Sequence, residues 1–308
     1  MAVPTIYNQI DANRRKTFFL MLGFSIFIVV VAYVLVLALG FEGIGALGFV
    51  GIFLIISGFV SLGSYYWSDK LVLSMTGAKP INKESNRDLY RIVENLTIAS
   101  GSPMPKIFVM DDPASNAFAT GRDPKHAVIV FSSGLLNRLD KLELEGVAAH
   151  ELSHVRNYDT RLMSIVVVLV GMIALLADIF LRSLWFGGGS RSRRGGGALI
   201  IIVGVAVAVL APIAAQLIKL SISRRREFLA DSSGALLTRN PEGLASALLK
   251  ISNDTTPAKH VSTANAHLFI ANPFKGKQGK SWLVRLFQTH PPMEERVKAL
   301  RSSIGPAG

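Results

Sequence analysis

Cysteine is absent from this chain of 308 residues. Without thiols the protein can form no disulfide and can offer no thiolate to a metal ion. A bound zinc ion would therefore need histidine, aspartate or glutamate ligands. This ligand set is more typical of catalytic zinc sites than of structural ones.

A nucleotide-binding loop is also missing. The triplet Gly279-Lys280-Ser281 ends like a phosphate-binding loop, but Phe274 stands where that motif requires its first glycine. The net charge of +12 could indicate nucleic acid, yet the basic residues gather beside apolar runs, at Arg14–Lys16 and Arg224–Arg226. Cytoplasmic flanks of membrane segments carry such charges. We therefore expect neither a nucleotide nor a nucleic acid as a partner.

Long apolar runs dominate the rest of the composition, and half of all residues are hydrophobic. Each run exceeds the roughly 20 residues needed to cross a bilayer. The first is also longer than the roughly 7–15 apolar residues of a signal peptide. We therefore expect a lipid bilayer as a partner and two transmembrane hairpins, formed by Thr17–Leu39 with Gly43–Tyr66 and by Met163–Phe186 with Ala198–Ile222.

Two polar blocks separate and follow these hairpins. Glu84–Ser100 carries apolar residues at helical spacing and stops before Gly101, so it predicts an amphipathic helix. Further helices are expected to begin at Pro241, with Asn240 as cap, and near Pro291. Short runs rich in Val, Ile and Phe predict a small antiparallel sheet from Lys106–Asp111, Asn116–Thr120 and Ala127–Phe131.

The run VAAHELSHVRNYD, Val147–Asp159, contains the most informative motif. Its apolar residues recur at helical spacing, which places His150 and His154 one above the other on a helix. Their imidazoles can then share one zinc ion, and Glu151 can act as general base toward a water in the open coordination position. The alternative is an ordinary solvated helix face, because a short motif also occurs by chance.

Two histidines leave a zinc site short of one protein ligand. The metzincin pattern is excluded, because Asn157 and Thr160 stand where it requires glycine and histidine. The remaining common solution is a glutamate from a second helix. Glu242 and the pair Glu294–Glu295 have another explanation, since they lie in the first turns of expected helices, where negative charge favours the helix dipole.

Glu227 stands apart from these glutamates. Asp231 follows it by one helical turn in RRREFLAD, so the two carboxylates can share a face. Such a pair can supply a metal ligand and a group that holds a histidine ring in its metal-binding tautomer. A solvated acidic face beside three arginines is the alternative.

The motifs HELSH, EFLAD, SNAFATG and THPPMEERV together resemble the HtpX family of membrane zinc metalloproteases, gluzincin-type relatives of the CAAX prenyl proteases. The resemblance extends over nearly the whole chain. It implies an α+β gluzincin-like protease domain with one Zn²⁺ per chain. The implied ligands are His150, His154 and Glu227, with Glu151 as base and Asp231 holding a ligand in place.

The same resemblance suggests a substrate-binding strand and a further catalytic residue. His290 would face the active site and assist the oxyanion, although it can equally be a loop histidine before a helix. The segment NAFA, which is similar to a segment of that family, would be an edge strand that pairs with the substrate backbone. The alternative is an ordinary strand. This segment comprises Asn116, Ala117, Phe118 and Ala119.

We therefore expect a mainly α membrane protein. His154 precedes Met163 closely and Glu227 follows Ile222 closely, so continuous helices would place the zinc within roughly 10–15 Å of the apolar segments. Basic residues at the tip of the second apolar pair leave open whether that pair fully crosses the bilayer. The expected parts are a transmembrane hairpin (1–66), a first protease half (67–162), a second hairpin (163–222) and a second protease half (223–308).

These inferences predict a multi-pass zinc endopeptidase of the prokaryotic cytoplasmic (inner) membrane, with its active site on the cytoplasmic side. Its substrates would be membrane proteins or unfolded polypeptides, and the resemblance adds a role in protein quality control. One alternative is a prenyl-protein protease. Another is a zinc-stabilised membrane scaffold without activity, which would have no need of Glu151.

Overall fold

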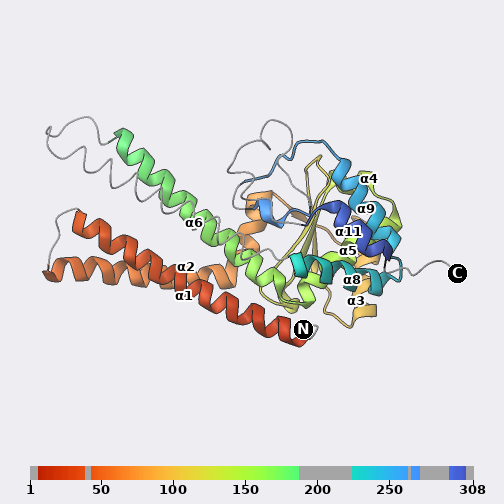
Figure 1. Cartoon of the computed structure of the whole chain (residues 1–308). Helices are drawn as coiled ribbons and strands as arrows, with labels where there is room; N and C mark the ends of the chain where they lie inside the picture. The colour runs from red at the N-terminus through yellow and green to blue at the C-terminus, as the bar shows by residue number, and fades with distance from the viewer. Residues whose placement is uncertain (1–5, 39–42, 187–223, 263–264, 271–290, 303–308) are drawn as a thin grey trace.

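Three long helices extend from a compact region in which shorter helices surround a small sheet (Figure 1). This computed structural model describes residues 6–38, 43–186, 224–262, 265–270 and 291–302. The helices are α1 (Ile6–Ala38), α2 (Gly43–Thr76), α3 (Arg87–Ser100), α4 (Ser133–Arg138), α5 (Lys141–Arg156), α6 (Asp159–Phe186), α8 (Arg224–Thr238), α9 (Pro241–Asn253) and α11 (Met293–Ser302). The strands are β1 (Lys79–Pro80), β2 (Lys106–Met110), β3 (Ala117–Thr120) and β4 (Val128–Ser132).

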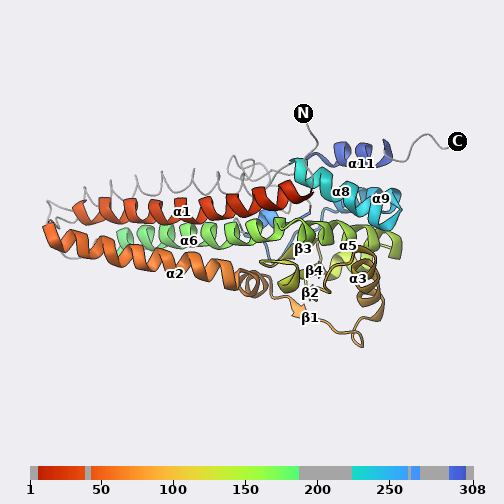
Figure 2. The same ribbon diagram turned by 90° about the horizontal axis from the view of Figure 1, so that it is seen from below.

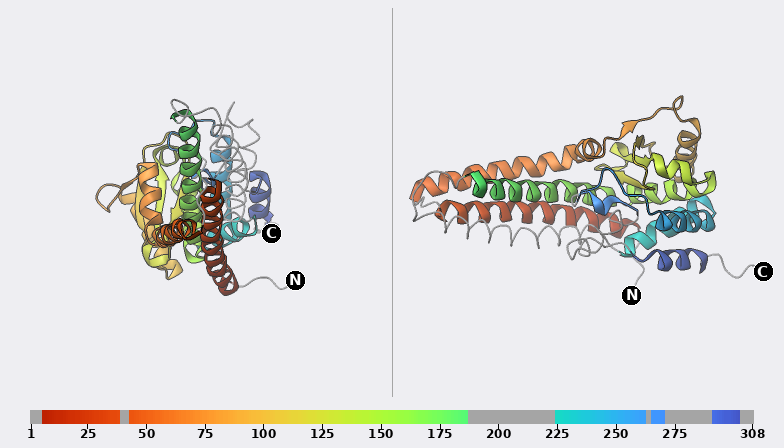
Figure 3. Two further views of the ribbon diagram at one scale, coloured as in Figure 1. Left: turned by 90° about the vertical axis from the view of Figure 1, so that its left-hand side faces the viewer. Right: turned by 90° about the horizontal axis from the view of Figure 1, so that it is seen from above.

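The long helices α1, α2 and α6 pack against one another (Figure 2). They extend to one side, away from the sheet and the shorter helices (Figure 3). The first three apolar runs fall on these helices, apart from Leu39, which lies outside the described residues, and α2 continues past Tyr66 to Thr76. Within the ranges described, none of the helices meets the combined length and apolarity that a bilayer crossing demands. The fourth run, Ala198–Ile222, lies outside the described residues.

The sheet has the strand order β1-β2-β4-β3. β3 is antiparallel to β4, with Phe118 opposite Val130, whereas β2 and β4 are parallel, with Ile107 opposite Ile129. The prediction of an antiparallel sheet was therefore wrong for this pair. The chain leaves β2, forms β3 at the far edge and returns as β4 between them, so that β4 runs in the direction of β2.

Local capping explains where several helices begin and end. α3 begins after Asn86, whose side chain accepts a hydrogen bond from the N–H of Leu89, and stops at Gly101, which adopts a left-handed conformation with φ 64°. α9 begins at Pro241 after its Asn240 cap, as predicted. The last helix, α11, begins at Met293, close to the expected Pro291.

The central helix of the compact region is α5, which packs against α3, α8, α9 and β3. It begins with a capping box between Asp140 and Glu143. Two glycines bring neighbouring backbones close to it. A Cβ atom on Gly146 would lie 2.7 Å from the backbone nitrogen of Leu244, and one on Gly234 would lie 3.1 Å from that of His150. Close backbone packing thus places α8 and α9 directly against the helix that carries both histidines.

Candidate metal centre

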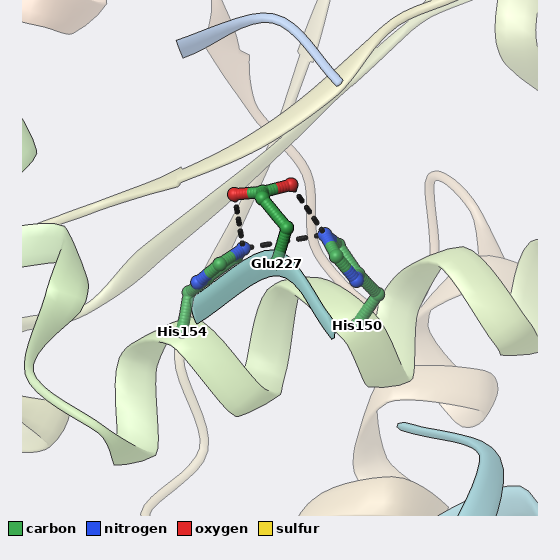
Figure 4. Close-up of side chains that lie close together, drawn as sticks. All are labelled: His150, His154 and Glu227. Carbon is green, nitrogen blue, oxygen red and sulfur yellow. Dashed lines mark hydrogen bonds and ion pairs between the residues drawn. The ribbon is translucent and has the colours of Figure 1, made fainter. Parts of the chain in front are cut away.

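Helix α5 presents His150 and His154 on one face, as their spacing predicts (Figure 4). Their Nε2 atoms lie 3.2 Å apart. Both side chains are buried. A solvated helix face, the alternative open in the sequence, is therefore excluded.

Glu227 comes from α8 and turns its carboxylate toward both imidazoles (Figure 4). Its Oε1 lies 3.6 Å from Nε2 of His154, and its Oε2 lies 3.9 Å from Nε2 of His150. Donors of a tetrahedral zinc site, with bonds of about 2.0–2.2 Å, stand about 3.3 Å apart. The separations here are close to that spacing, and all three donor groups lie within 4.8 Å of one another. The residues therefore fit a divalent cation of this size.

His150 is oriented by a carboxylate and an arginine. Its Nδ1 lies 2.9 Å from Oδ1 of Asp231, so its Nε2 is left for a metal ion. Arg296 of α11 donates two hydrogen bonds to Asp231, of 2.8 and 2.7 Å. Burial would raise the pKa of Asp231, but the Arg296 guanidinium outweighs that effect and holds the pKa at about 2. Asp231 thus lies beside a candidate ligand, and its role in holding that ligand stays a prediction.

His154 has a different carboxylate partner. Its Nδ1 lies 3.0 Å from Oδ2 of Asp159, the first residue of α6. Burial would lower the pKa of His154, but the hydrogen bond to Asp159 and the negative charge of Glu227 raise it to about 9. A metal ion would therefore have to displace a proton from this imidazole. Both rings thus have Nδ1 fixed and Nε2 directed toward the third ligand.

Glu151 lies beside the candidate ligands and is buried. Burial raises its pKa above the ordinary glutamate range, and positive charge on the neighbouring histidines offsets only part of this effect. A more basic carboxylate is a better proton acceptor near neutral pH. Glu151 borders a cavity of about 10 Å³, which has room for about one water molecule. The cavity is lined by Ala119, His150, Glu151, His154, Met163, Glu227, Leu268 and Ile270.

The predicted substrate strand forms β3, at the edge of the sheet next to α5. Ala119 borders the cavity. Asn116 precedes the strand, and its Oδ1 accepts a hydrogen bond of 3.1 Å from the backbone N–H of Ile270. The pairing of this strand with substrate stays a prediction. His290 lies outside the described residues, so its role also stays a prediction.

Two residues of the site were missed in the sequence. Asp159 lies within the quoted run VAAHELSHVRNYD, and Arg296 lies within THPPMEERV, but neither was assigned a role. The signal that could have found Arg296 is a lone arginine on the apolar face of a helix, since Val297 and Leu300 are also buried. Its side chain is fully buried.

An HExxH helix with a glutamate donor from a second helix defines a metallopeptidase site of the gluzincin type. The chain belongs to peptidase family M48, which it matches over residues 83–304. It is 46% identical to a protein named "Protease HtpX homolog" from Dictyoglomus thermophilum, over 96% of this chain and 94% of that protein. A relative of the same name from Caldanaerobacter subterraneus subsp. tengcongensis is 44% identical, over 98% and 99% of the two chains. The crystal structure of S. mikatae Ste24p aligns with a TM-score of 0.44 at 18% identity, over 88% of this chain and 61% of that one.

Proposed function

We propose that this metallopeptidase is a membrane-bound zinc endopeptidase that cleaves misfolded or damaged membrane proteins. Cleavage takes place at the cytoplasmic surface of a prokaryotic inner membrane. The observation that supports this proposal best is the convergence of His150, His154 and Glu227 on one buried cavity, with Glu151 beside them. One zinc ion per chain suits this set of nitrogen and oxygen donors.

The roles of the side chains follow from their positions. Zinc, when bound by the two histidines and Glu227, supplies a Lewis acid that polarises the scissile carbonyl and makes the attacking water more acidic. Glu151 takes the proton of that water and passes it to the leaving amine. Asp231 and Asp159 hold the two imidazole rings with Nε2 directed at the metal position.

The substrate would bind along β3. This strand is the edge of the sheet and its residue Ala119 borders the cavity, so an extended peptide added beside it would pass the reacting groups once Leu268 and Ile270, which border the same cavity, have moved aside. Only a locally unfolded segment can adopt that conformation. This requirement favours damaged or misfolded proteins over folded ones.

Exposed apolar side chains on α1 and α2 support contact with lipid. Phe18 is 62% exposed and Phe59 is 70% exposed. Soluble surfaces rarely carry so many large apolar groups together. Further exposed residues of the same kind are Phe19, Leu22, Ile26, Val30, Ile44, Leu47, Ile52, Leu54, Ile55, Ile56 and Leu62.

An aromatic group near the end of these apolar surfaces marks a boundary suited to the membrane–water interface. Tyr65, Tyr66 and Trp67 follow one another on α2, and the guanidinium of Arg122 lies 5.3 Å from the ring centre of Tyr66. Arg161, near the start of α6, lies 5.4 Å from the ring centre of Tyr65. The metal centre lies close to this aromatic group, because Asp159 also belongs to the start of α6 and contacts His154.

The proposed location can be tested by cysteine labelling, since the natural chain has no cysteine. Single cysteines replace Ser85 and Ser252, which are exposed and lie before and after the second apolar pair. A membrane-impermeant thiol reagent should label both only after the cells are opened. Labelling of either position in intact cells would contradict a cytoplasmic active site.

The proposed chemistry can be tested with Glu151→Gln, which keeps the side-chain shape and removes the proton acceptor. Zinc content should remain that of the parent, while cleavage of an unfolded membrane protein should fall by about 10²–10⁴-fold. Glu145→Gln, on the same helix but away from the cavity, is the matched control and should cleave normally. Equal cleavage by Glu151→Gln and the parent would show that Glu151 is not the base.

Two substrates separate the remaining alternatives. A prenylated CAAX peptide is offered to the parent beside the unfolded membrane protein. Cleavage of the prenylated peptide alone would favour a prenyl-protein protease. If the zinc-loaded parent cleaves neither substrate, a non-catalytic scaffold is favoured.

A further inference from the structure

The N-terminal end of α1 reaches the metal centre. Figure 2 shows this end of the helix beside α8 and the start of α6. Asn13 lies on it, ahead of the first apolar run, and is only 3% exposed. A buried amide at the end of a long helix requires hydrogen-bond partners, and those of Asn13 belong to the segment that follows the HELSH motif.

Asn13 and His154 share one carboxylate. The Nδ2 group of Asn13 donates a hydrogen bond of 2.7 Å to Oδ1 of Asp159, and the other oxygen of that carboxylate lies 3.0 Å from Nδ1 of His154. Nδ2 also donates to the backbone carbonyl of Asn157 at 3.0 Å. The amide therefore holds both the carboxylate and the backbone of the α5–α6 turn.

Arg226 determines which way the amide faces. Its Nη1 lies 3.4 Å from Oδ1 of Asn13 and 3.6 Å from Oδ1 of Asp159. With its oxygen toward this guanidinium, the amide must direct its N–H groups at Asp159 and Asn157. Arg226 directly precedes Glu227, so the same contact joins α1 to the helix of the third candidate ligand.

The turn that Asn13 holds has a strained backbone. Tyr158 has a φ of 58°, a left-handed conformation that is unfavourable for a residue with a bulky side chain. Surrounding contacts must keep such a residue in place. The neighbour of Asn13 contributes one, since the guanidinium of Arg14 lies 5.2 Å from the ring centre of Tyr158. Two consecutive residues of α1 thus contact this turn, in addition to Arg161 of α6, whose guanidinium lies 5.0 Å from the same ring centre.

We propose that Asn13 is a positioning residue of the metal centre, which fixes the Asp159 carboxylate so that His154 presents Nε2 to the metal ion. This inference rests on the metal site of the proposed function. It makes the first helix a working part of a site whose candidate ligands all come from the compact region. Removal of the amide leaves Oδ1 of Asp159 with only its longer contact to Arg226, so that the carboxylate holds the imidazole ring less firmly.

Cobalt(II) in place of zinc provides a readout that does not depend on activity. The visible spectrum of bound Co²⁺ reports the geometry of its ligands, and chelator competition gives its affinity. Asn13→Leu replaces the amide with a side chain of similar size that has no hydrogen-bond donors. It should alter the spectrum and weaken Co²⁺ binding about tenfold, which is the lower end of the 10–100-fold loss typical of residues that support metal ligands. Asp159→Asn should approach about 100-fold.

The matched control is Thr17→Val. Thr17 lies one helical turn after Asn13 and is also buried, but its hydroxyl has no hydrogen-bond partner within the described structure. This variant should bind Co²⁺ like the parent. A role of Asn13 in helix docking alone would lower the stability of Asn13→Leu but leave the spectrum and the affinity of the folded protein unchanged.

The double variant decides whether Asn13 acts through Asp159. In the Asp159→Asn background, Asn13→Leu should cause no further loss of Co²⁺ affinity. An equal loss in both backgrounds, or an unchanged affinity in Asn13→Leu, would overturn this inference alone. Failure of the parent to bind Co²⁺ would overturn the proposed metal site and the inference with it. If Asn13→Leu does not fold, Asn13→Ala takes its place with the same expected results.

Discussion

The two histidines of the metal centre are each held by a carboxylate, and the two carboxylates have different partners. His150 is held by Asp231, whose charge is balanced by Arg296, and all three residues belong to the compact region. His154 is held by Asp159, which receives a hydrogen bond of 2.7 Å from the neutral amide of Asn13 on the long helix α1 and has only a longer contact, of 3.6 Å, with a guanidinium, that of Arg226. The first support depends on a buried ion pair. The second depends on how the long helices sit against the compact region.

The two supports should therefore affect different properties, one the stability of the fold and the other the geometry of the metal centre. Breaking a buried ion pair leaves an unpaired charge and destabilises the fold strongly. Loss of the hydrogen bond from the neutral Asn13 amide should cost less, but it should loosen the carboxylate that holds the candidate ligand His154. We therefore expect the His150 support to govern folding and the His154 support to govern metal geometry.

Loss of Glu227, the candidate metal ligand that faces both histidines, should have the largest effect. Glu227→Ala removes the carboxylate that faces both Nε2 atoms, so purified protein should contain little zinc. Glu242→Ala is the matched control, because Glu242 pairs with Arg301 at the surface and lies away from the cavity. Elemental analysis measures both. Full zinc content in Glu227→Ala would remove Glu227 from the ligand set.

Arg296→Leu should destabilise the protein most among the residues that support a ligand. It leaves the buried Asp231 without its arginine and with only the imidazole of His150 beside it, with an expected loss of about 3–5 kcal/mol in the free energy of unfolding. Arg301→Leu removes an arginine of the same helix from an exposed pair with Glu242 and should change stability little. Urea unfolding of the metal-free proteins compares them. Similar values for the two variants would contradict the assigned dependence on charge.

The free energy of unfolding of the metal-free protein should also depend on pH through the ionisation of Asp231. Its pKa is lowered from 3.8 to about 2 on folding, so its contribution is present above about pH 4 and is lost as the pH falls through 2. That contribution amounts to about 2 kcal/mol. Asp231→Asn should therefore differ most from the parent near neutral pH, with the difference shrinking below pH 4. A constant difference across this range would show that the charge of Asp231 does not stabilise the fold.

Gly234→Ala should have the smallest effect of these changes. Its Cβ would lie 3.1 Å from the backbone nitrogen of His150, so α8 must move by a few tenths of an ångström and carry Glu227 with it. We expect a loss of about 1 kcal/mol in stability and a weaker metal affinity. Gly171→Ala in α6 is the control, because no atom lies within 4 Å of its Cβ position. Identical metal affinities in the two variants would show that this close approach does not position Glu227.

The sequence predicted that His150 and His154 share a helix face because helical spacing is local, whereas the choice of Glu227 as third candidate ligand also needed the family resemblance. His150, His154 and Glu227 each lie on a helix that the pattern of residues indicates. Asp159 could not be found in this way. On a continuous helix, a residue five positions after His154 would point about 140° away from it. Only the left-handed Tyr158 turns the chain so that Asp159 faces back to the imidazole.

Long-range pairing explains the other differences. Arg296 meets Asp231 across 65 positions of sequence, and no local pattern announces that contact. The prediction of an antiparallel sheet was wrong for a similar reason. Three short strands with brief connections are compatible with several strand orders. Both faces of β3 and β4 are buried, so these strands lack the alternation of polar and apolar residues that would have shown which face meets the core.

The small cavity beside Glu151 has a consequence for inhibitors. Leu268 and Ile270 border a space of about 10 Å³, so an extended compound cannot enter unless the segment that carries them moves away. Compounds of this kind should inhibit slowly, with an onset limited by that movement and not by diffusion. A small metal-binding anion should act at once. Progress curves that bend over time for peptide hydroxamates but run straight for small anions would reveal the difference.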